Sequence, residues 1–110
     1  MTGSQNTSDV LISELADDPD FADLVEMFVS ELPNRVAALQ RGIADQDYQA
    51  LASLAHQLKG SAGGYGFPSI TAAAALVEQS ARTASDLAQL TPKLRQLTDL
   101  CARARARAGD

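Results

Sequence analysis

The sequence predicts an all-α protein, an antiparallel up-down four-helix bundle with a short extra N-terminal helix. Apolar residues recur every three or four positions in four successive segments, which is the period of an amphipathic helix. No segment of useful length alternates apolar and polar residues, so no strand is expected. Because the connections between the segments are short, neighbouring helices should run in opposite directions.

The chain of 110 residues has room for one domain. Composition predicts a flexible tail at residues 1–7 and the helical domain at residues 8–108. Cys101 is the only cysteine, which excludes an internal disulfide and a cysteine metal cluster, and no metal site is expected. We expect Cys101 to be a small apolar core residue.

The formal net charge of −5 argues against nucleic-acid binding as the main function. The basic residues near the C-terminus are expected to complement the dipole of the last helix. They are Arg103, Arg105 and Arg107. The longest apolar run, residues 72–77, is far below the ~20 residues that a membrane span requires. With no secretory signal visible at the polar N-terminus, a cytoplasmic protein without membrane contact is expected.

The first half of the chain should hold the short helix and one long helix. Ser8 is a suitable N-cap for the short helix, and Asp18 with Pro19 is suited to begin the long one. Pro33 lacks the donor for the carbonyl of Val29, so a kink is expected there. The apolar face of the short helix would consist of Leu11, Ile12 and Leu15. One face of the long helix would carry Phe21, Leu24, Val25, Phe28, Leu32, Val36, Leu39 and Ile43, and Gly42 marks the approach of its C-terminus.

The central helix is expected to follow a turn at residues 44–47, with Asp45 as its N-cap. It should run to about Tyr65, where Gly66 is placed to end it. Its apolar stripe consists of Leu51, Leu54, Ala55, Leu58, Ala62 and Tyr65.

Two further helices complete the predicted bundle. Phe67 and Pro68 open the third, and the last follows a connection at residues 83–85. Pro92 should kink this last helix or make it begin afresh with Thr91 as its cap. The apolar stripes are Ile70, Ala73, Ala74, Val77 and Ala81 in the third helix, and Leu87, Leu90, Leu94, Leu97 and Cys101 in the last.

The predicted solvent-exposed face of the central helix carries an unusual set of residues. His56, the only histidine, shares this face with Lys59, Gly60 and Gly63. A glycine inside a helix costs about 1 kcal/mol relative to alanine, so these glycines give up stability. Their benefit is clearance, since a partner can approach an imidazole that no side chain flanks. A nucleophilic nitrogen with a cation beside it indicates a histidine that carries phosphate.

At this point the sequence resembles the histidine-containing phosphotransfer (HPt) domain family. The resemblance rests on the string AHQLKGSA at residues 55–62, with Gly66 ten residues after His56, and covers about residues 15–105. Flanking matches are Phe21, Leu24, Phe28, Leu32 and Pro33 before it, and Ile70, Ala74, Val77 and Glu78 after it. The resemblance implies that His56 takes phosphate from an aspartyl-phosphate or phosphohistidine and passes it to an aspartate of a response-regulator receiver domain.

The nitrogen of His56 that faces the donor must be unprotonated, so the other nitrogen needs a hydrogen-bond partner. Glu78 is the candidate, because an antiparallel hairpin about Gly66 places it level with His56. An acidic residue at this offset resembles the imidazole orienter of the chemotaxis-kinase branch of the family. An ordinary surface glutamate is the alternative.

Other side chains are candidates for holding the phosphate. Lys59 would neutralise its charge, and Arg82 is a second cation one turn further along the neighbouring helix. Gln57 and Ser61 have donors for phosphate oxygens, although both lie off the His56 face. The docking surface should combine the bare glycine backbone with an apolar rim from the long and central helices.

The resemblance implies a phosphocarrier and not an independent enzyme. No nucleotide-binding loop, catalytic serine set or metal cluster is visible, so no cofactor is expected, and any Mg²⁺ would be held by the partner receiver domain. Expected partners are receiver domains and a hybrid sensor histidine kinase, with a monomeric carrier. Two alternatives stay open: an isolated chemotaxis-kinase-type phosphotransfer module, and a helical interaction domain that is not phosphorylated.

Overall fold

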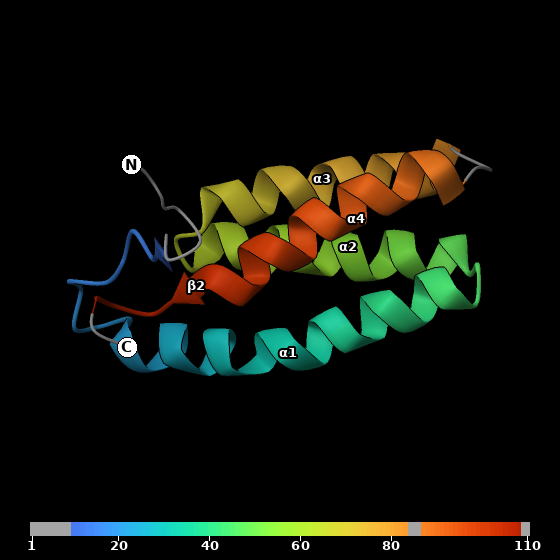
Figure 1. Cartoon of the computed structure of the whole chain (residues 1–110). Coiled ribbons are helices and arrows are strands. Elements are labelled where there is room, and N and C mark those ends of the chain that lie inside the picture. The colour runs from blue at the N-terminus through green and yellow to red at the C-terminus, as the bar shows by residue number, and fades with distance from the viewer. Residues whose placement is uncertain (1–9, 84–86, 109–110) are drawn as a thin grey trace, which may run out of the picture.

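The computed structural model describes residues 10–83 and 87–108, which form four helices and one pair of very short strands. Figure 1 shows the four helices lying alongside one another, with the strands at one end. The elements in chain order are β1 (Leu11–Ile12), α1 (Ala22–Ala44), α2 (Tyr48–Gly64), α3 (Pro68–Thr83), α4 (Leu87–Arg103) and β2 (Ala104–Arg105).

Most residues of the predicted apolar stripes are buried, but Ile12, Phe21 and Leu24 are 41%, 39% and 45% exposed. Helix α2 packs against α1 and α3, and α4 closes the group by packing against α3 and α1. The largest fully buried side chains come from all four helices and from the connection before α3. They are Phe67, Leu32, Leu39, Leu51, Leu58, Ile70, Leu90, Leu97, Val25 and Val77. The helical period of the sequence therefore identified the buried faces of the four helices, except at the start of the long helix, where the predicted apolar positions are exposed.

The predicted N-terminal helix is wrong. Leu11 and Ile12 form β1, which pairs in parallel with β2, and Ser8, the predicted cap, lies outside the described residues together with the predicted tail. The backbone then turns, and the Ser13 hydroxyl donates to the carbonyl of Tyr65 at 2.6 Å. Glu14 also donates from its backbone to the carbonyl of Gly66 at 2.9 Å. A segment this short gains more from these tertiary hydrogen bonds than from an isolated helical turn.

Helix α1 begins at Ala22, three residues after the predicted position at Pro19. The Asp18 carboxylate accepts from the backbone N–H of Asp20 at 3.0 Å, and the Asp18 carbonyl accepts from Phe21 at 3.1 Å. These bonds close a turn in which an aspartate side chain caps the backbone locally. Asp18 therefore stabilises a turn before the helix and is not its N-cap.

Neither internal proline ends its helix. Helix α1 continues from Ala22 to Ala44 through Pro33, so the missing donor there does not interrupt it. Helix α4 is continuous from Leu87 to Arg103 through Pro92, so the predicted new start at Thr91 is wrong. In both helices the buried side chains on either side of the proline keep one face, and this packing outweighs the lost hydrogen bond.

The N-cap of α2 is Asp47 and not Asp45. The Asp47 carboxylate accepts from the backbone N–H of Ala50 at 3.1 Å, whereas Asp45 caps the C-terminus of α1. Gly42 lies near the C-terminal end of α1, as expected, and is buried where α1 meets α2. A Cβ at this position would lie 3.1 Å from Cγ of Leu51, so glycine permits the close approach of the two helices.

Gly66 ends the α2 region as predicted, with φ at +85° after the C-cap residue Tyr65. Pro68 is the first residue of α3, again as predicted. Because proline fixes its own φ near the helical value, it starts α3 directly after the turn. This tight connection holds α2 and α3 as a closely packed pair.

Replacing Gly66 by alanine is expected to destabilise the fold by about 1–3 kcal/mol. Its positive φ disfavours any Cβ, and a Cβ here would lie 2.5 Å from Oγ of Ser13 and 2.8 Å from the backbone N of Glu14. Urea denaturation of both proteins measures the difference. The same change at the open, helical position Gly64 is the control and should not destabilise.

The C-terminal arginines do three different things. Arg103, in the last turn of α4, pairs with Asp99 at 3.2 Å, so only this arginine has the predicted place in the helix. Arg105 donates to the carbonyls of Ala102 and Ala104, while Arg107 pairs with a glutamate of α1. The basic cluster therefore stabilises the end of the bundle.

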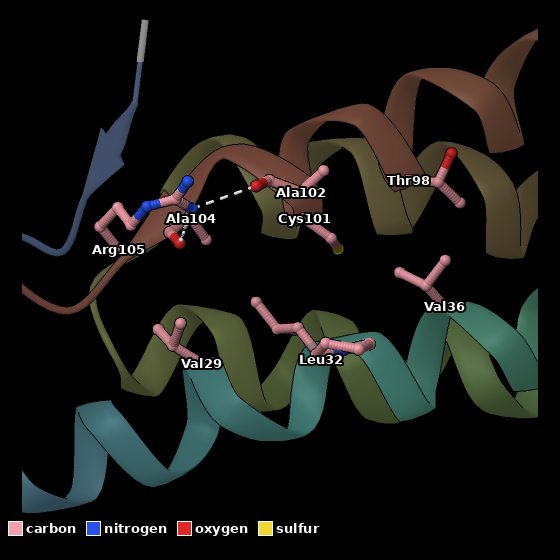
Figure 2. Close-up of a pocket in the computed structure, with 9 residues that line it drawn as sticks. Val29, Leu32, Val36, Thr98, Cys101, Ala102, Ala104 and Arg105 are labelled. Atoms are coloured by element: carbon pink, nitrogen blue, oxygen red, sulfur yellow. Dashed lines mark hydrogen bonds between the residues drawn. The ribbon is translucent and has the colours of Figure 1, made fainter. Parts of the chain in front are cut away.

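A groove of about 410 Å³ lies between α1 and α4 (Figure 2). Its walls are mainly apolar, and the buried thiol of Cys101 lies among them, as expected for an apolar core residue. Burial raises the pKa of this thiol to about 11. The groove is lined by Val29, Leu32, Pro33, Val36, Thr98, Cys101, Ala102, Ala104 and Arg105, and so by no residue of α2 or α3.

Candidate functional site

His56 lies on the outer face of α2, with 62% of its side chain exposed. Its Nδ1 atom is 3.0 Å from Oε2 of Glu78, which projects from α3. Since α2 and α3 meet at the turn around Gly66, residues at similar distances on either side of this turn lie level with each other. The contact expected from that spacing is present.

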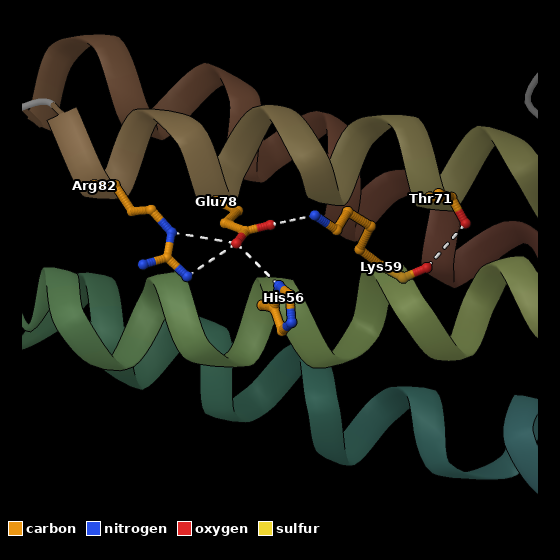
Figure 3. A network of polar contacts seen from close by, with 5 residues as sticks. All are labelled: His56, Lys59, Thr71, Glu78 and Arg82. Carbon is orange, nitrogen blue, oxygen red and sulfur yellow. Dashed lines mark hydrogen bonds and ion pairs between the residues drawn. The ribbon is translucent and has the colours of Figure 1, made fainter.

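Glu78 is surrounded by nitrogen atoms from two helices (Figure 3). Its Oε1 atom contacts Nζ of Lys59 at 2.8 Å. Its Oε2 atom accepts from Nε of Arg82 at 3.2 Å and from Nη2 at 2.9 Å, besides contacting His56. The Glu78 side chain is only 11% exposed, so these contacts fix a carboxylate that water barely reaches.

These contacts explain the acidity of Glu78. The hydrogen bond from Lys59, followed by that from Arg82, lowers the pKa of the Glu78 carboxyl from 4.5 to about 2. Burial opposes the shift, and the contact with His56 adds to it. Glu78 is therefore ionised at any pH at which the protein would work.

An ionised carboxylate can only accept hydrogen bonds, so the hydrogen between Glu78 and His56 belongs to Nδ1 of the imidazole. In the uncharged ring the other nitrogen, Nε2, then carries the lone pair. Figure 3 shows this part of the ring turned away from Glu78. Within the described residues, Nε2 makes no hydrogen bond. The arrangement presents an oriented nucleophile to solvent.

Lys59 lies one turn after His56 on the same helix, and its side chain is 35% exposed. The hydroxyl of Thr71, from α3, donates to the Lys59 carbonyl at 3.2 Å. This bond joins α2 to α3 next to the ion pair between Lys59 and Glu78. The ammonium is thus held against a carboxylate and remains within reach of solvent.

The glycines near His56 differ in their surroundings. A Cβ at Gly60 would meet no atom within 4 Å, and the same holds for Gly64. A Cβ at Gly63 would lie 3.3 Å from Oγ1 of Thr71. Gly63, predicted to provide clearance, therefore also permits close packing of α2 on α3. Gly60, one turn from His56, has no neighbour in the fold that would require a glycine at this position.

The remaining predicted side chains are less closely placed. Gln57 is exposed, while Ser61 is half-buried and faces α1, where it lines a small pocket with Tyr65 and Arg35. Arg82 belongs to the contacts of Glu78. The structure thus joins Lys59, Glu78 and Arg82 to His56, and leaves Gln57 and Ser61 outside this network.

The sequence prediction missed that both cations pair with Glu78. A signal was available for one of them, because Glu78 and Arg82 have the i, i+4 spacing at which opposite charges meet on a helix. By the same count from Gly66 that identified Glu78, Lys59 lies level with the turn of α3 just before Glu78, within reach of a long lysine side chain. The roles of both cations toward phosphate stay predictions, and their contacts with Glu78 in the unphosphorylated protein are the addition that the structure makes.

Acidification is expected to remove the stabilisation that Glu78 provides. Because the folded pKa, about 2, lies below the unfolded value of 4.5, this contribution is complete above pH 4.5 and is lost as the pH falls toward 2. Denaturant unfolding of wild type and Glu78→Gln at several pH values measures it. The difference in unfolding free energy should shrink over this range, and a constant difference would contradict the assignment.

The described residues contain no group of three or more histidine, cysteine, aspartate or glutamate side chains arranged to hold a metal ion. None of the helices in the described parts of the chain has the length and apolar character needed to cross a membrane.

The chain matches a family model of known proteins. The family model described as "Hpt domain" matches residues 23–107, which covers the four helices except the first residue of α1, and includes the His56 network. Neither the curated proteins nor the solved structures contain a match to this chain. The match to the family model extends over most of the sequence. The chain therefore belongs to the Hpt domain family, whose members transfer phosphate through a histidine in phosphorelays.

Proposed function

We propose that this protein is an antiparallel up-down bundle that carries phosphate on Nε2 of His56 between receiver domains of a phosphorelay. The observation that supports this most directly is the pairing of His56 Nδ1 with Glu78 at 3.0 Å, on a side chain that is 62% exposed. It leaves the second nitrogen unprotonated and open to a partner. The family match supports the same reaction class.

In the proposed reaction, the Nε2 lone pair attacks the phosphorus of an aspartyl phosphate on the receiver. The N–P bond forms, the P–O bond to the aspartate breaks, and the aspartate leaves as a carboxylate. The proton stays on Nδ1 of His56, so the phosphorylated ring is positively charged and donates to Glu78. Transfer to a receiver is the reverse, with the aspartate attacking and a neutral imidazole leaving.

Lys59 is proposed to neutralise the phosphoryl oxygens, since its ammonium already lies within the cluster around the imidazole. Arg82 adds a second positive charge to this cluster. Gln57 and Ser61 remain candidates for phosphate contacts only through movement of their side chains. The carrier itself is proposed to need no cofactor, with Mg²⁺ held by the receiver.

The receiver is proposed to dock across α2 and α1. The exposed ridge of α2 offers the bare backbone of Gly60, and α1 adds exposed apolar side chains at Leu24, 45% exposed, and Met27, 64% exposed. These two residues line a pocket of about 190 Å³ that reaches Ser61 on α2 and Tyr65 just after it. Bare backbone beside exposed apolar side chains matches the mixed surface expected of a transient protein interface.

The proposed partners are response-regulator receiver domains and a hybrid sensor histidine kinase, met by a monomeric carrier in the cytoplasm. The bond between Glu78 and His56 favours one second candidate, a phosphotransfer module of the chemotaxis-kinase type. A helical interaction domain without phosphorylation is the remaining alternative.

Pairwise incubation with phosphorylated receivers tests the proposal. Wild-type protein should gain a label that is lost in acid and retained in alkali, as expected of an N–P bond, and peptide mass spectrometry should place it on His56. Absence of label with every receiver would favour the interaction domain. Transfer to chemotaxis-type receivers alone would favour the second candidate.

A further inference from the structure

Glu78 has more positive partners than one carboxylate needs. Lys59 contacts Oε1 at 2.8 Å, and Arg82 contacts Oε2 through two nitrogens. His56 shares Oε2 with Arg82. Two permanent cations therefore surround a single negative charge while no phosphate is present, and one of them is available for another anion.

The two cations are attached to Glu78 in different ways. Arg82 lies four residues later on the same helix, and its planar guanidinium donates two hydrogen bonds to one oxygen. Lys59 reaches Glu78 from α2 by a flexible chain that ends in a single ammonium contact. Lys59 can therefore leave Glu78 by rotation of its side chain, whereas Arg82 would have to break two bonds.

We propose that Arg82 is a positioning residue, which anchors Glu78 so that Lys59 can move from Glu78 to the phosphoryl group on His56. The inference rests on the proposed function in taking His56 as the phosphate carrier. Lys59 lies three residues from His56 on the same helix, so a short swing brings its ammonium to the phosphate. Arg82 then keeps the carboxylate paired and in place.

The charges of the proposed reaction agree with this exchange. With an uncharged imidazole, Glu78, Lys59 and Arg82 together carry one net positive charge. Phosphorylation adds a dianion and makes the ring of His56 positive, so the cluster becomes neutral. The positive ring then binds Glu78 more strongly through Nδ1. The carboxylate therefore stays paired when Lys59 leaves Oε1. The same event creates the dianion that attracts Lys59.

Direct binding of phosphate by Arg82 is the competing assignment. Its side chain is 57% exposed, so rotation toward solvent is sterically open. The two assignments differ in one respect. If Arg82 acts through Glu78, its replacement slows phosphorylation only while the carboxylate is present. If Arg82 binds the phosphate, its replacement slows phosphorylation with or without the carboxylate.

A double-mutant cycle separates the two. Wild type, Arg82→Gln, Glu78→Gln and the double variant are each treated with phosphoramidate, a small donor that needs no docking surface. Arg82→Gln is expected to slow labelling roughly three- to tenfold in the wild-type background, and less than about twofold in the Glu78→Gln background. Equal slowing in both backgrounds would assign Arg82 to the phosphate and overturn the proposal.

A second measurement needs no phosphate. ¹⁵N NMR of the His56 ring reports which nitrogen carries the hydrogen. Wild type should show the Nδ1–H form, Arg82→Gln a mixture of both forms, and Arg82→Lys should restore the wild-type pattern. Unchanged ring signals in Arg82→Gln would contradict an anchoring role. Because this measurement is independent of transfer, it decides the role of Arg82 even if receivers fail to label the wild type.

Discussion

Replacing His56 by glutamine is expected to abolish phosphorylation of the protein by every donor. The sequence has one histidine, so no second imidazole can take the phosphoryl group. A glutamine amide has no nucleophilic lone pair on nitrogen, but its N–H group can donate to Glu78 as Nδ1 does. The variant therefore removes the chemistry and keeps a donor for the carboxylate.

Labelling by a phosphorylated receiver and by phosphoramidate measures this effect, with thermal unfolding as the control for folding. Since 62% of the His56 side chain is exposed, the unfolding free energy should change by no more than about 0.5 kcal/mol. Acid-labile label on the folded variant would show that the protein carries phosphate elsewhere. This result would contradict the assignment of His56 as the phosphorylated residue.

Much of the site could be predicted because helical geometry is local and regular. A period of 3.6 residues placed His56, Lys59 and Gly60 on one exposed face. Because α2 and α3 meet at the turn around Gly66, residues at similar sequence distances on either side of it lie level with each other. This predicted the contact between Glu78 and His56. Both steps need only the rise per residue and the position of one turn.

The errors in the predicted fold have two causes, a competing local turn and a pairing with a distant segment. Asp18 and Pro19 have the composition of a helix start, but the Asp18 side chain closes a turn before the helix. Leu11 and Ile12 are spaced for a helix, yet they pair with β2. No sequence window contains both partners of such a contact, because β2 lies at the opposite end of the chain. Pairing of this kind cannot be read from a local pattern.

The pairing of both cations with Glu78 was not predicted, for a different reason. Lys59 and Arg82 were assigned to phosphate because a cation near a candidate phosphohistidine can neutralise the charge of the phosphoryl group. In the unphosphorylated protein the nearest anion is Glu78, and both cations pair with it. Residue types indicate the sign of charge that gathers at a site. They do not indicate which of two anions a cation holds in a given state of the reaction.

Replacing Gly60 by glutamine is expected to block transfer from receivers and to leave the histidine itself reactive. Gly60 lies one turn after His56, and side chains on a helix lean toward its N-terminus, so the new side chain would lie over the approach to the imidazole. A receiver held back by even 1 Å is expected to transfer about 100-fold more slowly. Labelling by the small donor phosphoramidate should change by less than about twofold.

The same substitution should stabilise the fold, which makes the result hard to attribute to damage. A Cβ at Gly60 meets no atom within 4 Å, and a glutamine inside a helix is favoured over glycine by roughly 0.5–1 kcal/mol. Gly64→Gln is the matched control, because that glycine is equally open but one turn further from His56. Normal transfer by a stabilised Gly60→Gln protein would show that the receiver does not approach over this surface. Loss of transfer at both positions would extend the interface along α2 toward Tyr65.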